Sequence, residues 1–105
     1  MEKFELNDMT KGWLIGDFIP SVFRTKDFEV GIKKINAGEY ETSHYHKLAV
    51  EITVIIFGEA VMNNVNLKEN DIIVLKKNEK SDFKAITDVV LMVIKIPSIK
   101  YDKYM

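Results

Sequence analysis

The sequence contains no cysteine among its 105 residues, which excludes disulfides, thiolate metal sites and cysteine nucleophiles. No apolar run approaches the roughly 18 residues that a membrane-spanning helix needs. Proline (2) and glycine (5) are scarce, and neither a linker nor a repeat is present. We therefore expect a single domain that does not use a membrane as its partner.

The chain also lacks an excess of charge of either sign. The 15 basic residues are balanced by 16 acidic ones, arginine occurs only at Arg24, and no block of the chain forms a basic face for nucleic acid. The N-terminus mixes acidic with apolar residues and has no small-residue cleavage site, unlike a secretory signal. These features predict a cytoplasmic protein that does not bind nucleic acid.

The periodic signals that are present are short and typical of strands. Residues Phe28–Lys33 alternate between apolar and polar or small residues, the pattern of a half-buried strand. The β-branched run Ile52–Phe57 is typical of a strand that is buried on both faces. Further strands are expected at Ala60–Met62, Val65–Leu67, Ile72–Leu75, Phe83–Ile86 and Val89–Ile96, with turns at Gly58–Glu59 and Asn63–Asn64. About seven or eight strands without an amphipathic helix predict a sandwich or small barrel.

The two histidines carry the clearest chemical signal. His44 and His46 are two positions apart, so on a strand both imidazoles project from one face. Tyr40 and Thr42 share that parity. Glu51 follows at the head of a buried run, where a carboxylate requires a partner. Two imidazoles and one carboxylate form a good ligand set for a divalent metal, although exposed histidines and a surface glutamate would give the same spacing.

These residues also match a family motif. The spacing from Gly38 through His44-Tyr45-His46 and Glu51 to Gly58 resembles the first motif of the cupins at every position. The segment Asn70–Leu75 resembles the first half of the second cupin motif.

The second half of that motif departs from the family pattern. Lys76 stands where proline is usual, Asn78 where glycine is usual, and Ser81 where the metal-binding histidine is usual. The resemblance extends from about Phe28 to Ile96. Because of these departures, the chain lacks the histidine that serves as the fourth metal ligand in the family.

The resemblance implies an all-β fold, a small jelly-roll barrel of the cupin type. Residues 1–105 would form one domain with its barrel core at about 28–97, and residues 1–27 would add strands or dimer contacts. His44, His46 and Glu51 would hold a divalent Fe, Mn, Ni or Zn ion, and the alternative is a pocket without metal. Small cupins commonly pair, so a homodimer is expected, with contacts at the N-terminal segment and at Tyr101 and Tyr104.

Other residues are candidates for a ligand pocket. Tyr40, Thr42, Thr53 and Ser81 are expected to line the barrel interior. Arg24 offers a rigid fork for an anionic ligand, or it forms an ion pair with a neighbouring carboxylate. Trp13 is expected to pack in the core or an interface, or to stack on a ligand. The tail Lys100–Met105 is expected to be a loose end.

Three functions remain open at this point. The first is a metal-dependent oxygenase, isomerase or lyase acting on a small molecule. The second is a metal-free module that binds a sugar or an organic acid. The third is a structural protein with a residual motif. No catalytic residue is assigned, because the sequence carries no serine elbow, phosphate loop or paired-carboxylate signature.

Overall fold

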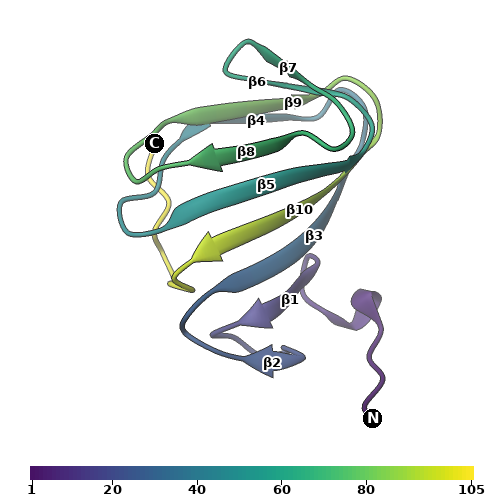
Figure 1. The fold of residues 1–105 in the computed structure, drawn as a ribbon, viewed down its shortest axis with the longest axis vertical. Coiled ribbons are helices and arrows are strands. Elements are labelled where there is room, and N and C mark those ends of the chain that lie inside the picture. Colours follow the sequence, from purple (N-terminus) through teal and green to yellow (C-terminus); the bar gives the residue numbers. More distant parts are fainter.

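The computed structural model describes residues 1–105 and consists of one short 3-10 helix and ten strands in two sheets (Figure 1). The all-β fold predicted from the sequence is confirmed. The elements are η1 (Leu6–Asp8), β1 (Trp13–Gly16), β2 (Phe23–Arg24), β3 (Glu29–Ile35), β4 (Tyr40–His44), β5 (Val50–Phe57), β6 (Ala60–Met62), β7 (Val65–Leu67), β8 (Ile72–Leu75), β9 (Ser81–Ala85) and β10 (Val89–Ile96).

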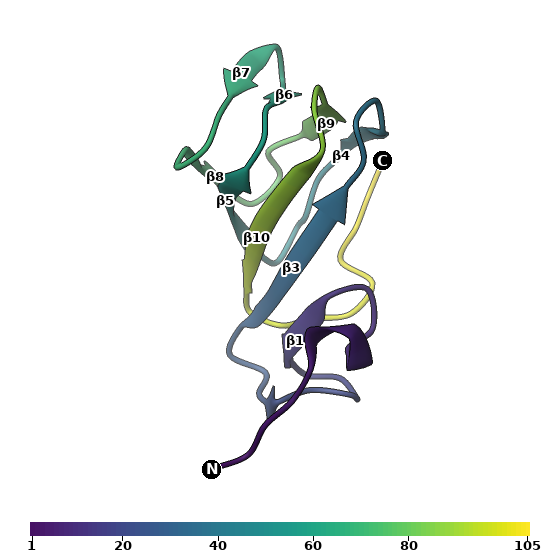
Figure 2. The ribbon, with the colours of Figure 1, turned by 90° about the vertical axis from the view of Figure 1, so that its right-hand side faces the viewer.

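The two sheets face each other as in a jelly roll. The larger sheet has the strand order β2-β1-β3-β10-β5-β8, and the smaller has the order β4-β9-β6-β7. Strand β10 is central, because it pairs antiparallel with both β3 and β5 along most of its length. From β3 onward the chain crosses from one sheet to the other at each connection except the β6–β7 hairpin, which stays in the smaller sheet (Figures 1 and 2). No helix is long and apolar enough to cross a membrane.

Two turns depend on residues that accept positive φ. Asn63 and Asn64, at φ 50° and 63°, form the turn expected between β6 and β7. Gly58 follows β5 at φ +90°, where an added Cβ would lie 2.1 Å from the Asp88 carbonyl oxygen. A side chain is therefore excluded at Gly58 by both conformation and space.

The core lies between the sheets. Alternate residues of β10, namely Val89, Leu91 and Val93, point inward and are buried. They pack against apolar side chains of five other strands, namely Ile55, Ala60, Met62, Leu67, Leu75, Phe83 and Ala85. Trp13, Ile35 and Ile73 pack against this core at its margin, and the inward polar residues Thr53 and Ser81 line the cavity described below.

Two expectations are corrected. Strand β5 was expected to be buried on both faces, but only its inner residues Thr53 and Ile55 are buried, and Ile56 on the outer face is 47% exposed. The tail was expected to be loose, but Asp102 is 6% exposed, and Tyr104 forms reciprocal backbone hydrogen bonds with Tyr45. The C-terminal tail is therefore part of the folded barrel, because these contacts pair its backbone.

Candidate functional site

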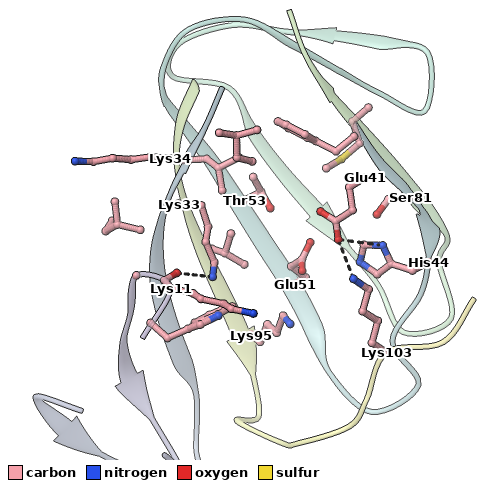
Figure 3. Close-up of a pocket in the computed structure, with 18 of the residues that line it drawn as sticks. Lys11, Lys33, Lys34, Glu41, His44, Glu51, Thr53, Ser81, Lys95 and Lys103 are labelled. Carbon is pink, nitrogen blue, oxygen red and sulfur yellow. Dashed lines mark hydrogen bonds and ion pairs between the residues drawn. The ribbon is translucent and has the colours of Figure 1, made fainter. Parts of the chain in front are cut away.

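A cavity of about 710 Å³ occupies the polar part of the barrel interior (Figure 3). Its walls come from the inner faces of both sheets and from the N-terminal segment that carries η1 and β1. The motif residues His44, His46 and Glu51 line it, together with Thr53 and Ser81. The period-two alternation of β5 puts Glu51, Thr53 and Ile55 on one inner face, which explains why a carboxylate and a hydroxyl reach the cavity beside the apolar core.

His46 is buried and held in one orientation. Its Nδ1 donates a hydrogen bond to the backbone carbonyl of Asp102 in the C-terminal tail. Its Nε2 is buried and has no hydrogen-bond partner, and it lies 3.5 Å from Oε1 of Glu51. In the neutral imidazole, a proton on Nδ1 leaves a free lone pair on Nε2, which is how histidine ligands of metals are oriented.

Glu51 and His46 stabilise opposite charges on each other. The Glu51 carboxylate raises the pKa of His46, while burial lowers it and the bond to Asp102 raises it. Burial raises the pKa of Glu51, but His46 and the positive charge of Lys95 outweigh burial and hold it below its ordinary value. The Glu51 carboxylate is therefore ionised, and it faces the imidazole of His46.

Asp102 also anchors the loop between His46 and Glu51. Its carboxylate accepts hydrogen bonds from the backbone N–H groups of Lys47, Leu48 and Ala49 at 2.9–3.2 Å. Burial raises the pKa of Asp102, but the hydrogen bonds from these N–H groups lower it by more than burial raises it. The pKa of Asp102 therefore lies below its ordinary value. Sequence reasoning missed this residue, because nothing local to the tail indicates that it reaches residues more than fifty positions earlier.

His44 reaches the cavity through a β-bulge. The pairing of β4 with β9 shifts register between Glu41, opposite Phe83, and His44, opposite Ser81. Three residues of β4 therefore span two of β9, so Glu41 and His44 both face inward. The Nδ1 of His44 donates to the carbonyl of Thr42 and lies 3.5 Å from Oε1 of Glu41.

The same bulge changes the expected neighbours of the histidines. Tyr40 and Thr42 were expected to share their face, but both are exposed and neither lines the cavity. Glu41 lines it instead. Strict alternation along β4 predicts that Thr42 faces the cavity and Glu41 faces outward. Only the register against β9 reveals the extra residue of the bulge, which reverses the two.

Of the other candidates, Ser81 is placed in the cavity and Arg24 is not. Ser81 is 3% exposed on β9, opposite His44. Arg24 lies on β2, outside the cavity, where its exposed side chain forms an ion pair with Asp17 at 3.2 Å. Arg24 therefore forms an ion pair, which was one of the two roles that the sequence left open, and it does not face a ligand in the cavity.

The donor atoms of His44, His46 and Glu51 are of the types that bind divalent cations, but they do not converge on one point. The lone pair of Nε2, the ionised carboxylate and the neighbouring imidazole of His44 are donors that such ions prefer. A separation of 3.5 Å between Nε2 and Oε1 is close to the roughly 3.3 Å expected between two ligands of one tetrahedral ion. No three His, Asp or Glu side chains converge closely enough to hold an ion together.

Lysines carry most of the charge on the cavity wall, and sequence reasoning missed them. The cavity is lined by Lys11, Lys33, Lys34, Lys95 and Lys103, against the two carboxylates Glu41 and Glu51. A local signal exists for two of them. Lys33 follows Gly31, and Lys95 follows Val93, at the inward parity of their strands. Lys95 ends the inner-face series of β10, whereas Ile35 continues that of β3 beyond Lys33.

No protein-family model matches the chain, and no curated protein matches it.

Solved structures with the same fold are numerous. An uncharacterized conserved protein with a double-stranded β-helix domain from Klebsiella pneumoniae is 22% identical, with a TM-score of 0.65 over 70% of this chain and 66% of that one. DMSP lyase DddQ from Ruegeria pomeroyi is 18% identical, with a TM-score of 0.73 over 89% of this chain and 49% of that one. A predicted oxalate decarboxylase from Thermotoga maritima is 24% identical, with a TM-score of 0.63 over 69% and 68%.

The chain thus has the cupin fold, the double-stranded β-helix, as its motif resemblance implies. It spans about half to two thirds of the length of these three structures. At such identities the likeness concerns the fold, and the activity has to be argued from the site.

Proposed function

We propose that this protein binds a divalent metal ion between His46 and Glu51, with His44 turning toward the ion as the third ligand, and holds a small molecule in the adjoining cavity. The observation that carries the proposal is the buried Nε2 of His46, which has no hydrogen-bond partner and faces the Glu51 carboxylate at 3.5 Å. A buried polar atom without a partner is costly, and a cation between the two groups would satisfy both.

The chain's own residues support such a site in three ways. The Asp102 carbonyl fixes the Nδ1 proton of His46 and so directs the lone pair of Nε2 into the cavity. The Thr42 carbonyl likewise accepts a hydrogen bond from Nδ1 of His44, whose ring centroid lies 5.4 Å from that of His46. Ser81 leaves the position opposite His44 open to water or a ligand. When bound, a divalent ion would supply Lewis acidity toward ligand oxygens.

A lyase reaction is the first activity to assay, because a lyase and a predicted decarboxylase are among the proteins that share the fold. Turnover would make the protein a metal-dependent enzyme. Binding without turnover would make it a metal-dependent binding protein, and the proposed ligands would be the same.

Metal content tests the proposal directly. Protein purified without chelator should contain near-stoichiometric metal by inductively coupled plasma mass spectrometry, and the variants His46→Ala and Glu51→Gln should contain none. Glu39→Gln is the matched control, since Glu39 is an exposed carboxylate that does not line the cavity. Circular dichroism confirms that each variant is folded. A native protein that stays metal-free after loading with iron, manganese, nickel and zinc would refute the metal site.

A metal-free binding module is the second candidate. It is favoured by the opposite shifts in the pKa of His46 and of Glu51, which allow the two side chains to neutralise each other. On this proposal a sugar or organic acid occupies the cavity and stabilises the fold without turnover. A ligand-dependent rise in melting temperature in protein shown to lack metal would support it, and the absence of any such rise across a metabolite library would oppose it.

A further inference from the structure

The geometry points to a ligand subsite at the end of the cavity away from the histidines, between Lys33 and Lys95 on the face of Trp13. This subsite would bind the anionic group of a small organic acid or phosphate ester. It rests on the proposed function, since it names the class of small molecule that the cavity holds. Figure 3 shows Lys33, Lys11 and Lys95 on one side of the cavity and His44 and Ser81 on the other, with Glu51 between them.

Tertiary pairing brings this subsite together. Lys33 on β3 and Lys95 on β10 are inward residues of neighbouring strands, and their Nζ atoms lie 4.2 Å and 5.2 Å from the Trp13 ring centroid. Trp13 can lie there because Gly31 is beneath it, where an added Cβ would be 2.7 Å from the indole. The indole thus forms a flat floor with two ammonium groups beside it.

Neither ammonium group forms an ion pair, although Glu29 and Glu51 stand across the strands from Lys95, and the charges of Glu29 and Glu41 act on Lys33. The ion pairs of the chain involve Arg24, Lys103 and the two histidines, and none includes Lys33 or Lys95. Lys33 donates its one hydrogen bond to the neutral carbonyl of Lys11 at 2.7 Å. Burial, together with the charge of Lys95, lowers the pKa of Lys33 to about 8. Like charges at a partly buried site repel each other, and a bound anion would relieve that repulsion.

Trp13 is the only tryptophan of the chain, so its fluorescence reports on this subsite. We expect benzoate, succinate and phenyl phosphate to change the emission in a saturable manner, whereas neutral benzamide leaves it unchanged. The relative affinities of the carboxylates and the phosphate identify which anion is preferred. The double variant Lys33→Met/Lys95→Met should bind at least tenfold more weakly, and the exposed, outward Lys84→Met should bind as the native protein does.

The outcomes separate this inference from the metal proposal. Metal content is measured in the same samples, so loss of anion binding with metal retained, or the reverse, assigns each failure to its own site. No saturable change with any anion, or equal affinity in the double variant, would overturn the subsite. Because the two methionine replacements remove charges from a partly buried position, the variant should melt no lower than the native protein.

Discussion

Replacing Asp102 tests whether the C-terminal tail holds the site together. In the native protein its carboxylate accepts hydrogen bonds from three consecutive backbone N–H groups of the loop between His46 and Glu51. Its backbone carbonyl orients His46 at the same time. The change Asp102→Ala removes the first set of contacts and retains the second, so it separates anchoring of the loop from orientation of the histidine.

The expected loss of stability follows from the burial of the three donors. A hydrogen bond to a charged group contributes about 1.5–3 kcal/mol. Lys47 and Leu48 are exposed, so water replaces much of what they lose, whereas Ala49 is 2% exposed and its N–H would be left without a partner. We expect Asp102→Ala to lower the free energy of unfolding by about 3 kcal/mol. For a chain of this length that corresponds to a fall in melting temperature of about 12–24 °C.

Urea unfolding followed by circular dichroism measures this loss, and Asp102→Asn is the matched variant because it keeps one acceptor oxygen. The pKa of Asp102 is lowered in the folded protein, so its contribution is complete above the unfolded value near 3.8 and disappears as the pH falls below it. The difference between native protein and Asp102→Asn should therefore narrow below about pH 4. A loss under about 0.5 kcal/mol in Asp102→Ala, or a difference that does not depend on pH, would refute the anchoring role.

Three further outcomes follow from single contacts. Gly58→Ala should destabilise the fold by at least about 2 kcal/mol, measured by urea unfolding, because its Cβ would meet the Asp88 carbonyl at a positive φ. Tyr104→Ala should lower the melting temperature measured by calorimetry, since it removes the ring stacked on Tyr45 at 5.5 Å, whereas Tyr104→Phe should not. Lys33 should titrate near pH 8 in NMR of the ¹³C-methylated protein, and a value near 10.5 would contradict its burial.

Much of the fold could be predicted from local sequence. The alternation in Phe28–Lys33 and the apolar run Val89–Ile96 predicted strands that the structure contains as β3 and β10. Paired asparagines predicted the β6–β7 turn, and a glycine predicted the end of β5. The bounds of the short strands β1 and β2 could not be predicted within residues 1–27, because two to four residues carry too little periodicity to be recognised.

The sequence by itself determined which residues could carry the chemistry: the only two histidines, two positions apart, and the carboxylate that opens a buried strand. Only the tertiary structure decided what surrounds them. The bulge in β4 exchanged Thr42 for Glu41, and the tail brought Asp102 to His46. The order β3-β10-β5 likewise brought lysines of separate strands to one cavity wall. Alternation along a strand is a local property of the backbone, whereas register and strand order depend on pairings between residues far apart in the chain.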